Sequence, residues 1–171
     1  MENSKVMEDI QNHRDHRNID IDQVGVKGIR YPITVLDKDM GEQQTVAEIN
    51  MYVNLPRYYK GTHMSRFVEI LNEHSRRISL QNFPEILEEM KDRLNAESAH
   101  MEVRFPYFIN KSAPVTGSPG LMEYKCAFRG ALNSGSDLVM MIHVPISTLC
   151  PCSKEISEFG AHNQRGEVRL Q

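Results

Sequence analysis

The chain has 171 residues, enough for one domain with a hydrophobic core or for one domain and part of another. Hydrophobic residues make up 40% and charged residues 25% of the sequence, as in ordinary globular proteins. The net charge of -3 excludes a general basic surface that would attract nucleic acid or an acidic membrane. No apolar run reaches the ~18–20 residues of a membrane-spanning helix, and the first residues lack the apolar core of a secretory signal.

The cysteine pattern indicates reduced thiols. The chain has three cysteines, an odd number, and Cys150 and Cys152 flank Pro151. A disulfide between such close neighbours would be strained, because disulfide geometry is narrow. Free thiols persist in a reducing compartment, so we expect a cytoplasmic protein.

Residues 1–19 are polar and charged and predict a mobile N-terminal arm. Within this arm, His13 and His16 have a spacing that could bind a metal on a helix. A solvated tail is the favoured interpretation, because nothing nearby would build a fixed site.

The hydrophobic period changes along the next stretch of the chain. Alternating apolar residues over 29–35 and 45–55 predict a long antiparallel hairpin, in which Pro32 marks an edge strand or a bulge. The period then becomes helical, and the first of two helices is expected to begin near Thr62, an N-cap residue type. The apolar faces of the two predicted helices are Met64, Phe67, Val68, Leu71 and Ile78, and Phe83, Ile86, Leu87, Met90 and Leu94.

Strand-like alternation returns after the helices. Residues 101–109 and 122–128 predict two further strands, and Cys126 is expected to be an inert core thiol. A fifth strand is predicted over 138–146 and a sixth over 166–171. Strands grouped around a helix pair indicate the α+β class, with an antiparallel sheet and the helices on one face.

The loop between the last two predicted strands contains Cys150, Cys152 and His162. Thiolate and imidazole are ligands that zinc prefers. The residue types leave three alternatives: a metal site, a nucleophilic or redox cysteine, and buried thiols beside a hydrogen-bonded histidine. For a metal site, the third ligand stays open among Cys152, Glu155, Glu158 and a group beyond the end of the sequence.

Three separated segments carry a resemblance to a known family. They are VGVKGIRYP at 24–32, KGTHMSRFVE at 60–69, and CPCSKEIS at 150–157 followed by AHNQRG at 161–166. Together, and in this order, they resemble the signature of the type IB GTP cyclohydrolase I family. The resemblance extends from about residue 20 to the end of the chain.

The resemblance implies the tunnelling fold (T-fold), whose module is ordered strand, strand, helix, helix, strand, strand. Family subunits contain two modules and assemble into homo-oligomers, typically tetramers. We therefore expect residues 20–133 to form the first module. Residues 134–171 would form the opening hairpin and metal-site loop of an incomplete second module. Because family members are considerably longer, we expect a truncated chain, with the remaining metal and guanine-binding residues beyond its end.

The resemblance also implies an enzyme, a hydrolase acting on cyclic amidines. The family converts GTP and water to 7,8-dihydroneopterin triphosphate and formate, the first step of tetrahydrofolate biosynthesis. A divalent metal, zinc or manganese, activates the water. By correspondence of motifs, Cys150 is the catalytically important metal ligand and His162 the second metal ligand. Cys152, Glu155 and Glu158 then take supporting roles.

Lys60, His63, Ser65 and Arg66 are the predicted triphosphate-binding residues. They open the first predicted helix, where free backbone amides favour anions. The alternative interpretation is that they are ordinary surface cations and helix-start residues. Two alternative functions stay open: an inactive metal-binding or assembly fragment, and a T-fold nitrile reductase with a cysteine nucleophile. No nucleic-acid or membrane partner is expected.

Overall fold

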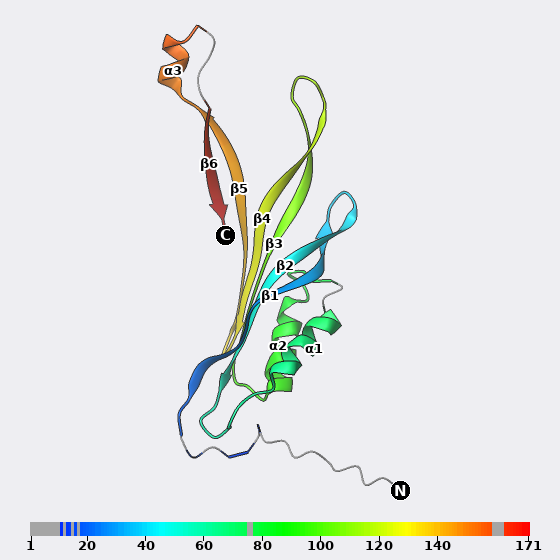
Figure 1. Cartoon of the computed structure of the whole chain (residues 1–171), viewed down its shortest axis with the longest axis vertical. Helices are drawn as coiled ribbons and strands as arrows, with labels where there is room; N and C mark the ends of the chain where they lie inside the picture. Colours follow the sequence, from blue (N-terminus) through cyan, green and yellow to red (C-terminus); the bar gives the residue numbers. More distant parts are fainter. Residues whose placement is uncertain (1–10, 12, 15, 17, 75–76, 159–162) are drawn as a thin grey trace.

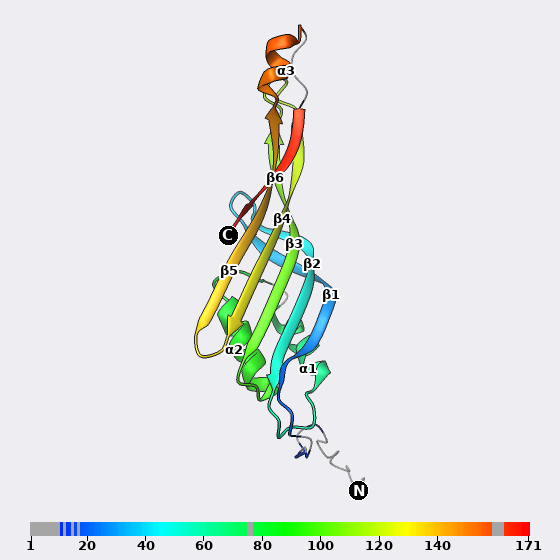
Figure 2. The same ribbon diagram turned by 90° about the vertical axis from the view of Figure 1, so that its left-hand side faces the viewer.

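The computed structural model describes residues 11, 13–14, 16, 18–74, 77–158 and 163–171. Its described strands form one six-stranded antiparallel sheet in sequence order, β1 to β6 (Figure 1). The elements are β1 Ile21–Asp37, β2 Gly41–Leu55, α1 Met64–His74, α2 Phe83–Leu94, β3 Ala99–Ser112, β4 Pro119–Leu132, β5 Ser136–Leu149, α3 Pro151–Ile156 and β6 Asn163–Leu170. Helices α1 and α2 cover one face of the sheet, as Figures 1 and 2 show. The predicted α+β class and its helix pair on one face are confirmed.

Strand β1 is an edge strand with two irregularities, and its glycines explain the motif at residues 24–32. The register with β2 shifts between Val26 and Ile29, where Gly28 has a φ of 70°. A Cβ atom on Gly25 would lie 2.0 Å from the carbonyl oxygen of Met51, so only glycine allows this approach. The predicted edge position of Pro32 is confirmed, because β1 is the first strand of the sheet.

Asp37 shapes the turn between β1 and β2. Its Oδ1 atom accepts hydrogen bonds from the backbone N–H groups of Asp39 at 2.9 Å and Met40 at 2.8 Å. Gly41 then adopts a φ of 80°, which glycine reaches without steric cost. This local chemistry closes the predicted hairpin.

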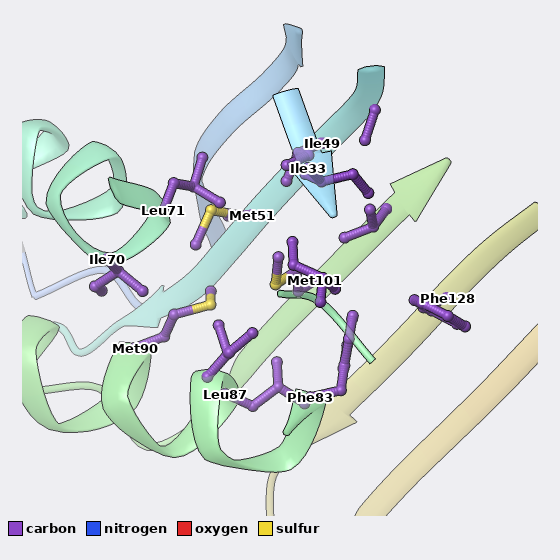
Figure 3. Close-up of a cluster of buried hydrophobic side chains, with 14 of the residues drawn as sticks. Ile33, Ile49, Met51, Ile70, Leu71, Phe83, Leu87, Met90, Met101 and Phe128 are labelled. Atoms are coloured by element: carbon purple, nitrogen blue, oxygen red, sulfur yellow. The ribbon is translucent and has the colours of Figure 1, made fainter. Parts of the chain in front are cut away.

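The hydrophobic core lies between the helix pair and strands β1 to β4 (Figure 3). All five predicted core residues of α2 are buried, and Pro84 lies in its first turn as expected. The helix ends at Asn95, whose left-handed φ of 50° is a common C-cap geometry. Each large apolar side chain removed from water contributes about 1.5–3 kcal/mol to folding. Core burial therefore holds the helices on the sheet.

The predicted buried face of α1 needs correction. Met64 and Val68 are each 41% exposed, whereas Ile70 is fully buried. Ile78 is buried but lies beyond the end of the helix, where its N–H donates to the carbonyl oxygen of Thr34 at 2.9 Å. The buried face of α1 is therefore Phe67, Ile70 and Leu71, one step around the helix from the predicted face.

Strands β3 to β6 continue the sheet. Strand β4 pairs with β5 from Leu132–Ser136 to Lys125–His143, so the sheet is unbroken at residue 134, where we expected a new module to begin. The division into modules stays a prediction. Beyond His143, β5 pairs only with β6, and this hairpin diverges from the β3–β4 hairpin and leads to α3 (Figure 1).

Two further findings concern the ends and surface of the molecule. Residues 1–10 of the expected N-terminal arm lie outside the described residues, and Arg14 makes an isolated bridge to Tyr59. The mobility of the arm stays a prediction. Within the described residues, no helix is both long and apolar enough to cross a membrane.

Candidate metal and substrate site

Cys150 lies at the junction between β5 and the short helix α3. Its backbone is extended, with φ −73° and ψ 113°, as expected for a residue that precedes a proline. Pro151 occupies the first turn of α3, where its missing N–H costs no hydrogen bond. The carbonyl oxygen of Cys150 accepts a hydrogen bond from the N–H of Lys154 at 3.2 Å. The strand end and the proline thus hold the cysteine in a defined backbone geometry.

The surroundings of Cys150 favour its thiolate form. The pKa of Cys150 is lowered, first by a hydrogen bond with the Ser153 side chain and then by one with the Ser153 backbone N–H. Cys126, in contrast, is buried, and burial raises the pKa of its thiol to about 11. The prediction that Cys126 is an inert core thiol agrees with this environment. Cys152 is exposed.

The described residues do not assemble a complete metal site. His162 lies outside the described residues, so the structure does not test its predicted role. Among the described residues, no group of three or more His, Cys, Asp or Glu side chains is arranged to hold a metal ion. Glu155 and Glu158 are exposed. The donor chemistry of Cys150, a thiol with a lowered pKa, fits zinc.

The predicted triphosphate-binding residues lie around the start of α1. The backbone N–H groups of Lys60 and Gly61 donate to the carbonyl oxygens of His13 and Gln11, each at 3.2 Å. These bonds tie residues 60–61 to the segment before β1, and α1 begins at Met64, two residues later than expected.

Two of these residues make contacts that belong to the helix pair. The Arg66 guanidinium donates to the carbonyl oxygen of Arg93 at the end of α2, which ties the two helices together. The carbonyl oxygen of His63 accepts from the Arg66 N–H at 3.2 Å. Ser65 is exposed. The proposed substrate role of these groups stays a prediction.

The structure does not bring the two predicted groups of site residues together within one chain. Helix α3 and Cys150 lie at one end of the long axis, whereas the start of α1 lies in the opposite half (Figures 1 and 2). Residues 144–149 of β5 extend beyond the pairing with β4, which adds about 20 Å of strand between them.

Two features of the cysteine loop were missed by the sequence analysis. The helix α3 was expected to be loop, although a proline in the first turn is a signal for a helix start. Ser153, which contacts the thiol, was not singled out. Ser153 lies three residues after Cys150, the N-cap residue of α3. At this spacing, a side chain in the first helical turn faces the N-cap residue.

A family comparison covers almost the whole of this α+β chain. Residues 7–171 match the family described as type I GTP cyclohydrolase FolE2. The chain therefore belongs to the FolE2 family of type I GTP cyclohydrolases. The resemblance to type I GTP cyclohydrolases is thus confirmed, and the match names FolE2 where the motifs indicated type IB.

Curated relatives agree with this family. The chain is 62% identical over 166 residues to GTP cyclohydrolase FolE2 of Syntrophobacter fumaroxidans, covering 96% of this chain and 65% of the relative. It is 58% identical to that of Syntrophotalea carbinolica, covering 96% of this chain and 62% of the relative. It is 60% identical to that of Desulfosudis oleivorans, covering 96% and 64%. The chain thus spans less than two thirds of the length of these relatives.

Proposed function

We propose that this chain carries part or all of a GTP cyclohydrolase that converts GTP and water to 7,8-dihydroneopterin triphosphate and formate. This reaction is the first step of tetrahydrofolate biosynthesis. The observation that carries the proposal is the match to the FolE2 family over residues 7–171. A curated relative that is 62% identical to the chain adds to this support. The type IB assignment and a cytoplasmic location remain expectations from the motifs and the free cysteines.

Cys150 and His162 are the proposed ligands of a divalent metal, zinc or manganese. The support for Cys150 is its position after a rigid strand and its lowered pKa, because metals bind the thiolate form of cysteine. The support for His162 is its place in the AHNQRG motif, which follows Cys150 in the same strand connection. A bound divalent metal would lower the pKa of a water molecule and make it nucleophilic near neutral pH.

Lys60, His63, Ser65 and Arg66 are the proposed contacts of the GTP triphosphate. These side chains and Cys150 lie far apart in one chain, so a single GTP molecule would meet both groups only across two copies. We therefore propose self-association, with a homotetramer as the expected assembly. Arg66 also ties α1 to α2 through its hydrogen bond to Arg93. This contact is compatible with Arg66 binding the triphosphate and with Arg66 having only a structural role.

GTP turnover tests the proposal directly. The chain is incubated with GTP and with zinc or manganese, and the products are oxidised and examined for pterin fluorescence. We expect fluorescence with added metal and none after a chelator. Cys150→Ala is expected to abolish both turnover and stoichiometric metal binding.

Cys152→Ala is the comparison variant, because it removes the neighbouring thiol, whose hydrogen bond is the smallest of those that lower the pKa of Cys150, and leaves Cys150 itself in place. It is expected to keep metal binding and turnover. Pterin formation by Cys150→Ala at the unmodified rate would contradict the catalytic role of Cys150. Metal binding without any pterin would favour the alternative of a metal-binding or assembly fragment.

A further inference from the structure

The sheet face opposite α1 and α2 carries a hollow of about 800 Å³ that extends from β1 to β6. Figure 2 views the sheet from this side, with the helices behind the strands. Ala127 on β4 and Met141 on β5 are both buried and form part of its floor. The lining contains five Arg or Lys side chains against three Glu side chains. The lining of the hollow therefore carries more basic than acidic side chains.

Three basic side chains line up across adjacent strands in this hollow. Lys125 on β4 is directly opposite His143 on β5, and His143 is directly opposite Arg169 on β6. Directly opposed residues of antiparallel strands point to the same face, with Cβ atoms about 4.5–5.5 Å apart. On its other side, Lys125 is opposite Pro106 of β3, which carries no charge. We call Lys125, His143 and Arg169 the basic row.

No carboxylate stands directly opposite a member of this row. Opposite charges in directly opposed positions stabilise a sheet, and like charges there destabilise it. Residues that go against such a structural preference, and whose side chains gain no packing from it, are expected at functional sites. The arrangement thus calls for an external partner of negative charge.

The nearby carboxylates are largely engaged by other cations. Glu102 accepts from Arg104 at 2.8 Å and from Arg129 at 3.0 Å. Arg104 also lies 3.5 Å from Glu48.

Glu167 is the carboxylate next to the basic row, and it lies 2.6 Å from His143. Lys125 and Arg169 act on Glu167 only through their charges, and no ion pair is recorded for either among the described residues. Glu123 is the remaining acidic residue of the lining. Among the described residues, Lys125 and Arg169 are thus the cations of the row without a recorded ion pair.

We propose that the basic row binds a phosphate-type polyanion in this hollow, with Lys125 and Arg169 as the direct charge contacts and His143, held by Glu167, between them. Phosphoryl oxygens suit this arrangement, because several cations spaced along a row each form a charge-assisted hydrogen bond to a different oxygen. The site is separate from the proposed metal ligand: Cys150 lies just beyond β5, about 20 Å from His143 along the strand. The inference therefore goes beyond the proposed function.

Calorimetric titration of the chain with inorganic triphosphate at low ionic strength tests this site. We expect saturable binding that weakens as salt is added, because exposed charges are screened. Lys125→Gln and Arg169→Gln are each expected to weaken binding roughly tenfold. GTP is the second arm: equal affinity for GTP and inorganic triphosphate would assign recognition to the phosphate groups alone, whether free or part of a nucleotide.

Lys111→Gln is the matched control, because it removes one exposed cation at the far end of β3, outside the hollow. It is expected to leave binding unchanged, and so is Cys150→Ala, which separates this site from the proposed metal site. Circular dichroism of each variant establishes that it is folded. Amide chemical shifts of the unmodified chain give a second readout and are expected to move at Lys125, His143 and Arg169.

Three results would overturn the proposal. They are the absence of triphosphate binding by the unmodified chain at low ionic strength, unchanged affinity in a folded Lys125→Gln/Arg169→Gln variant, and equal weakening by Lys111→Gln. Shifts confined to other strands would likewise place the anion elsewhere.

Discussion

Replacing Asn50 with aspartate tests the polar network that anchors the edge strand β1. Asn50 is only 5% exposed. Its Oδ1 atom accepts from the Gly28 N–H at 2.8 Å, and its Nδ2 atom donates to Oε2 of Glu102 at 3.2 Å. Asn50→Asp keeps the shape of the side chain and the acceptor for Gly28. It replaces the donor toward Glu102 with a second carboxylate oxygen.

The two carboxylates would then face each other at the distance of the present hydrogen bond. At 3.2 Å, their repulsion is about 5 kcal/mol for an effective dielectric constant of about 20. Burial raises the pKa of Glu102, but Arg129, Arg104 and Asn50 together hold that pKa below its usual value. Because the two arginines remain and one carboxyl can take up a proton, we expect a net loss of about 2–4 kcal/mol near pH 8.

The pH dependence identifies the cause of this loss. Repulsion raises the pKa of the new carboxyl in the folded state above its unfolded value of about 3.9. The loss is therefore small below about pH 4, where the carboxyl is protonated in both states. It grows as the pH rises and reaches its full size above the folded-state pKa.

Urea unfolding of Asn50→Asp at acidic and at mildly alkaline pH measures both quantities. Circular dichroism is the suitable probe, because the chain contains no tryptophan. Asn54→Asp is the matched control: Oδ1 of Asn54 accepts from the N–H groups of Glu97 at 2.8 Å and Ser98 at 2.7 Å, and aspartate keeps both acceptors. We expect its stability to change by less than about 0.5 kcal/mol. An equal loss at both pH values, or an equal loss in Asn54→Asp, would refute the reasoning.

Two further predictions concern titratable groups. In the Cys152→Ser variant near neutral pH, a thiol reagent is expected to modify Cys150 well before Cys126. The reason is that the pKa of Cys150 is lowered, whereas the pKa of Cys126 is raised to about 11. Equal modification rates of the two cysteines in the folded chain would contradict this prediction. The pKa of Asp37 is lowered chiefly by a hydrogen bond from Tyr107. The ionised Asp37 therefore stabilises the fold at pH values above its pKa in the unfolded chain, and this stabilisation is lost as the pH falls through its pKa in the folded chain. Asp37→Asn is expected to flatten this part of an acid-unfolding curve, whereas Tyr107→Phe should reduce it; an unchanged curve in both variants would count against the assignment.

Local patterns were sufficient for most elements of the fold. The period of two predicted the strands, and the spacing of apolar residues predicted every buried residue of α2. The same reasoning misplaced the buried face of α1, because Ile78 fits the helical period but packs from the connecting segment. The spacing of apolar residues shows which residues could share a helix face, but it does not show where the helix ends.

The candidate site was accessible to sequence reasoning only in its local chemistry. Cys150, the proline after it and the three motifs were visible directly, and the family match agrees with the resemblance that the motifs carry. The contact of Ser153 with the thiol needed the helix α3, which is too short to produce a hydrophobic period. The bond from Arg66 to Arg93 joins two helices and left no trace in the spacing of either residue.

The sequence alone determined the α+β class and the relation to type I GTP cyclohydrolases, because each depends on local residue types and on their order. Only the tertiary structure decided which distant residues meet. It separated Lys60–Arg66 from Cys150 along the long axis, and it aligned Lys125, His143 and Arg169 across three strands. The physical reason is strand register: shifting a strand by one residue turns every side chain to the opposite face, and register follows from pairing between strands rather than from either strand alone.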